Sequence, residues 1–106
     1  MKQYKLVVFV PDDAAAVVRD AMTAAGAGKI GNYTHVTFTS TGVGRFKPEQ
    51  GANPAIGAVG KLEAVAEQRI ETVCMADCLK QVVRAIRDAH PYEEPAIDVY
   101  PIEVLD

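Results

Sequence analysis

The sequence predicts an α+β fold whose strands and helices follow the order β-α-β-β-α-β. Two observations lead to this expectation: four strand-like segments separate two segments with helical periodicity, and two β-rich segments follow one another in the middle. Two crossovers around a central hairpin give a four-stranded antiparallel sheet with both helices on one face, the ferredoxin-like arrangement. The first and third strands then lie in the centre. A length of 106 residues suits one domain over the whole chain, 1–106.

The first half of the fold begins with an apolar, β-branched run at 5–10, which is typical of a covered central strand. Asp12 or Asp13 is expected to cap the following helix, because a short carboxylate accepts from free N–H groups of a first turn. The helix is predicted over 13–25, and Gly26 is expected to end it in a left-handed conformation. Its apolar stripe consists of Ala14, Val17, Val18, Ala21, Met22 and Ala25.

A second strand is predicted over 33–39, where β-branched and aromatic residues alternate with polar ones. The segment 42–60 contains five glycines and two prolines, and we expect a long loop there, of the kind that carries function or is disordered. A third strand is predicted over 61–75, strongest at 69–74.

The second helix is expected to start at a cap on Asp77 and to end at Pro91. Its apolar stripe consists of Leu79, Val82, Val83, Ile86 and Ala89. The final strand is predicted over 96–100, and Pro101 indicates an edge position because proline cannot donate to a central ladder.

Composition excludes several classes of function. A net charge of -3 argues against nucleic acid or an anionic membrane as partner. No apolar run reaches the ~20 residues of a membrane span, and no signal peptide is recognisable. Two cysteines without a dense framework indicate a reducing cytoplasm. An apolar fraction of 49% favours a buried subunit interface and therefore a homo-oligomer.

The predicted topology sorts the polar residues by end of the sheet. Asp12, Asp13, the glycine-rich loop and the stretch 90–95 are expected at one end, and His35 with the two cysteines at the other.

The stretch 90–95, His-Pro-Tyr-Glu-Glu-Pro, has two interpretations. It is either a turn bounded by prolines with solvated carboxylates, or a site for a divalent metal ion such as zinc or manganese. The metal ligands would be His90, Glu93 and Glu94. Tyr92 would pack its ring and hydrogen-bond its hydroxyl, or help to hold a ligand.

Cys74 and Cys78 also leave two interpretations open. Both cysteines can be small core residues, or Cys78 can have a lowered pKa in a first helical turn. His35 could join them as a metal ligand, or it could be a strand histidine satisfied by hydrogen bonds. No nucleophile–base constellation is recognisable, so no catalytic residue is predicted.

Several motifs in order resemble one known module. They are Ile30–His35, Gly51–Pro54, Gly57–Leu62, Arg69–Thr72 and His90–Pro95. Together they resemble the domain inserted in NGG-one-interacting-factor-three-like proteins, some of which are called type-two GTP cyclohydrolase homologues. That domain is itself similar to the trimeric CutA and PII proteins. The family's dinuclear metal ligands come from flanking segments that these 106 residues do not contain, so the resemblance implies no hydrolase chemistry here.

The resemblance to PII proteins implies an anion-binding role for the glycine-rich loop, through Arg45, Lys47 and Lys61. The alternative is a loop that packs against a neighbouring subunit. Three functions follow as expectations. The first is a non-enzymatic, oligomeric binding or regulatory module, trimeric or otherwise dimeric, with an unknown small ligand. The second is a divalent-metal-binding protein in cation handling. The third is a partner or remnant of a dinuclear-metal hydrolase.

Overall fold

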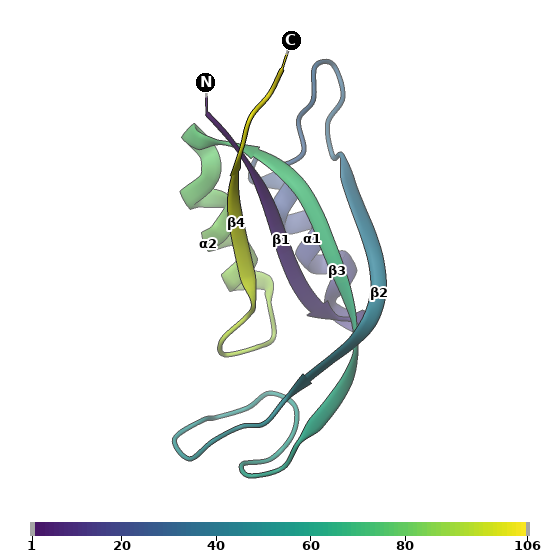
Figure 1. Cartoon of the computed structure of the whole chain (residues 1–106), viewed down its shortest axis with the longest axis vertical. Coiled ribbons are helices and arrows are strands. Elements are labelled where there is room, and N and C mark those ends of the chain that lie inside the picture. The colour runs from purple at the N-terminus through teal and green to yellow at the C-terminus, as the bar shows by residue number, and fades with distance from the viewer. Residues whose placement is uncertain (1, 106) are drawn as a thin grey trace.

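The chain folds into one four-stranded antiparallel sheet and two helices, as the sequence predicts (Figure 1). The computed structural model describes residues 2–105. Its elements are β1 (Gln3–Pro11), α1 (Ala15–Ala24), β2 (Thr37–Phe46), β3 (Glu63–Met75), α2 (Leu79–Ala89) and β4 (Ile97–Ile102). The strand order β2-β3-β1-β4 places β1 and β3 in the centre and β4, which contains Pro101, at an edge. Neither α1 nor α2 has the length and apolarity to span a membrane.

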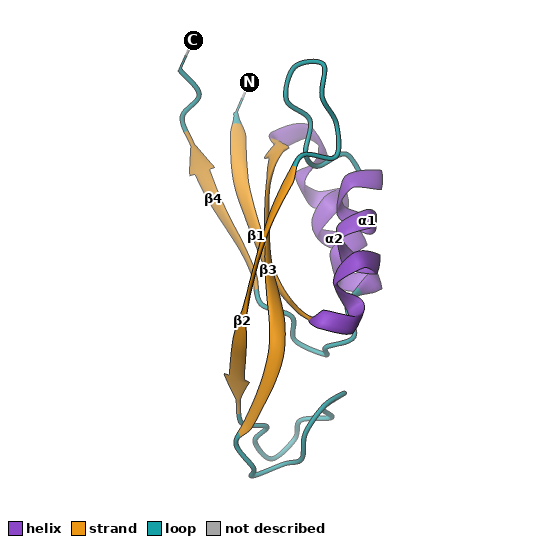
Figure 2. Ribbon diagram, turned by 90° about the vertical axis from the view of Figure 1, so that its right-hand side faces the viewer, coloured by secondary structure: helices purple, strands orange, loops and turns teal. Residues whose placement is uncertain are grey.

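Both helices cover the same face of the sheet (Figure 2). Successive strand residues point to opposite faces, so Leu6, Val8 and Val10 of β1 meet the helices. All three are completely buried. They share one hydrophobic cluster with Ile70 of β3 and with the buried helix residues Val18, Met22, Val82 and Ile86. This cluster is the core, and it fixes both helices on the sheet.

The opposite face of the sheet has no helix over it (Figure 2). Phe9 lies on this face, with the Arg69 guanidinium carbon 5.7 Å from its ring centre. Phe38 of β2 and Tyr100 of β4 share the face by their register and are 66% and 45% exposed. Large apolar side chains therefore remain uncovered on the open face of the sheet.

The buried stripe of α1 differs from the prediction at two positions, Val17, which is exposed, and Ala15, which is buried but was not predicted. Val17 is 60% exposed, and the buried residues are Ala15, Val18 and Met22, which recur at intervals of three and four. The placing of Val17 in the stripe was wrong because that stripe was drawn wider than the helix–sheet contact. Gly26 follows the helix with a φ of 119°, which confirms the predicted glycine stop.

The helices also begin differently from the prediction. Short 3-10 turns, η1 (Asp12–Ala14) and η2 (Ala76–Cys78), precede α1 and α2, and no side chain caps either helix. The caps predicted at Asp12 or Asp13 and at Asp77 are therefore wrong. These aspartates lie inside the tighter turns, where a backbone carbonyl accepts from the N–H three residues later.

The second strand starts later and extends further than the prediction over 33–39. It includes Gly42 and Gly44, which were expected in the loop, and the connecting loop is 47–62. The reason is that β3 is 13 residues long and offers ladder partners that outweigh the low strand propensity of glycine. His35 is exposed in the preceding segment with a φ of 61°, so it is not the strand histidine that was considered.

The hairpin of β2 and β3 extends beyond the end of β1. The last β1–β3 pair is Pro11 with Glu67, and β2 and β3 continue to pair from there to the loop. We call residues 43–66 the arm. It gives the molecule principal extents of 49 × 24 × 22 Å, and its loop turns toward the helical side of the sheet (Figure 2).

Candidate functional site

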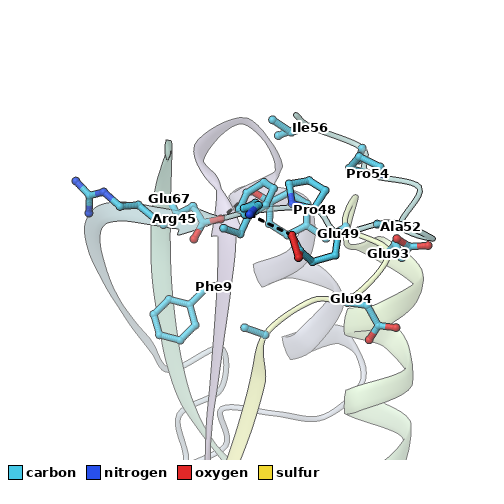
Figure 3. Close-up of a pocket in the computed structure, with 16 residues that line it drawn as sticks. Phe9, Arg45, Pro48, Glu49, Ala52, Pro54, Ile56, Glu67, Glu93 and Glu94 are labelled. Atoms are coloured by element: carbon cyan, nitrogen blue, oxygen red, sulfur yellow. Dashed lines mark hydrogen bonds and ion pairs between the residues drawn. The ribbon is translucent and has the colours of Figure 1, made fainter. Parts of the chain in front are cut away.

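The candidate functional site is a cavity of about 520 Å³ at the base of the arm (Figure 3). It lies between the end of β1, the arm and the turn between α2 and β4. This arrangement confirms that the glycine-rich loop and the 90–95 stretch share one end of the sheet. The apolar part of the cavity wall consists of Phe9, Phe46, Pro48, Ala52, Pro54, Ala55, Ile56 and Ala96.

His90 is not among the residues that line the cavity, and its ring connects the turn to the end of β1. It is 7% exposed, and its Nε2 lies 2.8 Å from the carbonyl oxygen of Phe9. The backbone N–H of Tyr92 donates to its Nδ1 over 3.1 Å. A carbonyl only accepts and an N–H only donates, so the ring is neutral with its proton on Nε2. Burial lowers the pKa of His90, against opposing effects of the Phe9 carbonyl and the Glu67 carboxylate.

These contacts bear on the predicted metal site. Neither ring nitrogen of His90 has a free lone pair, so coordination of a metal ion would require the loss of one hydrogen bond. Glu93 accepts from the backbone N–H of Asn53 over 2.9 Å, and Glu94 lies apart from it on the rim (Figure 3). Within residues 2–105, no three His, Cys, Asp or Glu side chains gather as metal ligands. The geometry does not favour the ligand set His90, Glu93 and Glu94.

Tyr92 links the turn to the sheet. Its hydroxyl donates to Oε2 of Glu67 over 2.8 Å, and its ring meets the Phe46 ring edge-on with centroids 5.7 Å apart. Burial raises the pKa of Tyr92 well above its usual 10, and the bond to Glu67 adds to the shift. Glu67 itself is only 8% exposed. A phenol and a buried carboxylate thus form the polar centre of the cavity.

Gly44 provides the space that Glu67 occupies. A Cβ at position 44 would overlap the Glu67 carboxylate, whereas a Cβ at Gly42 would meet no atom within 4 Å. The two glycines look equivalent in the sequence, and only the fold distinguishes them.

The predicted anion-binding residues are partly brought together. Arg45 and Lys47 line the cavity, while Lys61 lies outside the set of lining residues. Lys47 also lies 3.6 Å from a carboxylate oxygen of Glu49. Glu67 and Phe9 were missed by sequence reasoning because each reads as an ordinary strand residue, and Gly44 was missed because it was expected in the loop. A signal existed for Glu67: it is a charged residue in the half of β3 that pairs with a glycine-rich strand.

The cysteines lie at the other end of the sheet, as expected. Cys74 is 2% exposed in the core, and its sulfur lies 3.5 Å from that of Cys78. Burial, followed by the contact with Cys78, raises the pKa of Cys74 to about 12, which favours the core interpretation over a reactive thiolate there. His35 is exposed, with its Nδ1 2.9 Å from the Thr34 hydroxyl, and does not join them.

No family model matches the chain. It is nevertheless 54% identical over 99 residues to the GTP cyclohydrolase 1 type 2 homolog of Halalkalibacterium halodurans, covering 93% of this chain and 27% of that protein. The Bacillus subtilis protein of the same name is 52% identical over 99 residues, covering 93% and 26%. The chain therefore spans about a quarter of the length of these relatives.

Two solved structures are similar to this chain. A Bacillus cereus protein related to NIF3 matches with a TM-score of 0.85 and 48% identity over 97% of this chain and 26% of that one. The periplasmic divalent cation tolerance protein CutA from Archaeoglobus fulgidus matches with a TM-score of 0.70 and 17% identity, over 96% and 85%, and shares the fold. The chain is thus a relative of the NIF3-related GTP cyclohydrolase 1 type 2 homologs over about a quarter of their length, and it has the fold of CutA.

Proposed function

We propose that this chain is a non-enzymatic, oligomeric binding or regulatory module of CutA/PII type, which holds a small ligand in the cavity at the base of the arm. The observation that carries the proposal is the construction of that cavity. An apolar wall surrounds a few fixed polar groups, Glu67 and Tyr92 among them, as in sites for small molecules. Its volume of about 520 Å³ lies in the range of ligand-sized clefts.

The arrangement of the polar groups supports binding rather than catalysis. Tyr92 has a raised pKa and donates to Glu67, so it is a poor nucleophile near neutral pH. His90 has both ring nitrogens in hydrogen bonds and no substrate-facing lone pair. We therefore expect no turnover of GTP by the purified chain. A cytoplasmic location follows from the cysteine content and belongs to the same proposal.

Assembly is supported by the open face of the sheet. Phe38 and Tyr100 lie on this face and are 66% and 45% exposed, and β2 and β4 are free edges within the described chain. We expect a second and third copy to cover these surfaces, because the resemblance to CutA and PII implies a trimer, with a dimer as the alternative.

The test of assembly is multi-angle light scattering of the purified chain at micromolar concentration. We expect the mass of a trimer, and Phe38→Glu should lower it by placing a charge on the uncovered face. Val17→Glu is the matched control, since Val17 is similarly exposed on α1 but lies on the helical side. A wild-type monomer at high concentration would contradict the oligomeric module, and metal-dependent GTP turnover abolished by Glu67→Gln would contradict the non-enzymatic one.

A second candidate is a partner of a metallohydrolase chain. It is favoured by the 54% identity over 99 residues to a GTP cyclohydrolase 1 type 2 homolog, in which the matching segment makes up 27% of the length and is joined to further residues. A tagged chain should then retain, in a pull-down from its own cell extract, a protein similar to that remaining part. Recovery of the untagged chain alone would favour the homo-oligomeric module instead.

A further inference from the structure

Glu67 is a buried carboxylate with one oxygen left over. It is 8% exposed, and Tyr92 donates to its Oε2 over 2.8 Å. Within residues 2–105, no donor is found for Oε1, and no lysine or arginine nitrogen lies within 4.0 Å of the carboxylate. Oε1 is not a fully buried atom, so a molecule in the cavity can reach it. A carboxylate that is largely buried loses part of its hydration, so a further hydrogen-bond donor at Oε1 is favourable. An accessible carboxylate oxygen on the wall of a cavity can accept a hydrogen bond from a bound molecule.

The surroundings hold this carboxylate in place. The missing side chain at Gly44 leaves room for it, and Tyr92 fixes Oε2. Tyr92 is in turn held by its backbone bond to His90 and by the ring of Phe46. Strand β2 and the turn before β4 thus converge on the carboxylate of Glu67 in β3, which is how a polar group for ligand recognition is positioned in advance.

The space in front of Glu67 is suited to a ring-sized apolar body. Glu67 lines the cavity of about 520 Å³ together with Phe9 and Phe46, and Pro54 and Ile56 of the loop lie on another side (Figure 3). Aromatic and proline side chains provide flat apolar surface at a low entropic cost of ordering.

The charge around the cavity selects the sign of the ligand. Four carboxylates line it, those of Glu49, Glu67, Glu93 and Glu94, against two cations, those of Arg45 and Lys47. Lys47 lies beside Glu49, so its charge is partly compensated. The surplus of two negative charges disfavours a phosphate or carboxylate and favours a cation.

We propose that the cavity binds an organic cation, a protonated amine or amidine on a ring-sized apolar body, whose N–H group donates to Oε1 of Glu67. This inference rests on the proposed binding module and specifies its ligand class. It departs from the anionic ligand suggested by Arg45, Lys47 and Lys61. The apolar body lies against Phe9 and Phe46, and the charge-assisted bond to Glu67 completes the pairing of the carboxylate.

The experiment measures binding of four probes of similar shape by chemical-shift titration of the wild-type protein. Benzylamine and benzamidine are the cations, benzyl alcohol is the neutral probe and benzoate is the anion. We expect the cations to bind at least about tenfold more tightly than the neutral probe, a ratio that corresponds to about 1.4 kcal/mol. The shifts should centre on Gly44, Glu67 and Tyr92.

Glu67→Gln keeps the shape and removes the charge, and we expect it to lower the affinity for benzylamine by about tenfold or more. Glu71→Gln is the matched control, because it removes the same charge from the same strand outside this cavity. It should leave benzylamine binding unchanged. Circular dichroism and light scattering establish that both variants keep the fold and the assembly. The preference of the wild type among the four probes remains a complete test if Glu67→Gln does not fold.

Three results would overturn the ligand class: no binding of either cation, equal binding by Glu67→Gln, or preferential binding of benzoate. If benzoate or inorganic phosphate binds in the cavity instead, the binding module stands and only the sign of its ligand is wrong. If no probe binds and the cavity resonances change on dilution together with the oligomer mass, a second copy fills the cavity. That result overturns the small-molecule site and leaves the oligomeric assembly intact.

Discussion

The two ends of the β1–β3 pair bury different kinds of groups. In the part of the sheet that the two helices cover, together with those helices, which we call the body, the largest buried side chains are apolar, among them Leu6, Met22 and Ile70. At the base of the arm, the buried groups are the carboxylate of Glu67 and the imidazole of His90, both next to Tyr92. Burial of apolar area stabilises a fold. Burial of a polar group removes its hydration, and the hydrogen bonds that the group then makes within the protein at best offset that loss. The comparison indicates that the body supplies the stability and the arm base supplies the site.

The largest expected effect concerns the body. Ile70→Ala should lower the free energy of unfolding by about 2–5 kcal/mol, because it leaves a cavity in a fully packed core. Ile56→Ala removes the same atoms from the wall of the open cavity and should cost about 1 kcal/mol or less. Urea unfolding followed by circular dichroism gives both values. Equal losses would show that the arm base contributes to stability as the body does.

The next effect concerns the space above Glu67. Gly44→Ala should lower the free energy of unfolding by about 1–3 kcal/mol, because the new methyl group displaces the carboxylate from Tyr92. Gly42→Ala is the matched control, with open space around its Cβ, and should stay within about 0.5 kcal/mol of the wild type. Thermal or urea unfolding separates the two variants. A harmless Gly44→Ala would mean that the Glu67 position is not fixed by this glycine.

A smaller effect is expected from the hydrogen bond itself. Tyr92→Phe should cost about 1–2 kcal/mol below pH 10, since it leaves a buried carboxylate without its donor. The pKa of Tyr92 is raised above the unfolded value of 10. Its contribution is therefore fully present below pH 10 and lost as pH rises toward the folded pKa.

Carbon NMR of the tyrosine ring checks this titration. The phenol of Tyr92 should ionise above the ordinary tyrosine value of 10, because burial raises its pKa. In Glu67→Gln the pKa of Tyr92 should fall toward 10, because one of the causes of its shift is removed. An ordinary titration of Tyr92 in the wild type would argue that the bond to Glu67 is not maintained in solution.

The smallest effect is the acid dependence set by His90. Burial lowers the pKa of His90 below its unfolded value of 6.5, so its neutral form is favoured in the folded chain. The folded protein should lose stability as pH falls below 6.5, while the unfolded state binds the proton first. In His90→Gln this part of the pH dependence should disappear. If the dependence of stability on pH below 6.5 is the same in His90→Gln as in the wild type, groups other than His90 cause the acid sensitivity.

Zinc binding measured by calorimetry near neutral pH tests whether the 90–95 turn is a metal site or a structural turn. If the turn were a metal site, His90→Ala and Glu94→Gln would each lower zinc affinity and leave the fold unchanged. The two hydrogen bonds of the His90 ring lead to a different expectation, in which His90→Ala lowers stability and leaves any zinc affinity as it was. A loss of zinc affinity in both variants would restore the metal hypothesis.

The sequence determined the fold class and element order because periodicity, turn residues and helix stops are local. The run at 5–10, the apolar stripe of α2 and the stop at Gly26 all lie where they were predicted. The end of the sheet that carries the site also followed from topology alone, since crossovers fix which connections meet.

Only the tertiary structure decided which residues make the site. Gly44 belongs to a strand because β3 pairs with it, and Glu67 is buried because Tyr92 and that glycine meet it from distant parts of the chain. The hydrogen bond between the His90 ring and the carbonyl of Phe9, 81 positions away in the chain, is likewise made by the fold and not by the local pattern around His90. Burial and pairing of a polar group depend on neighbours that the fold brings together, and no local pattern of residues records them.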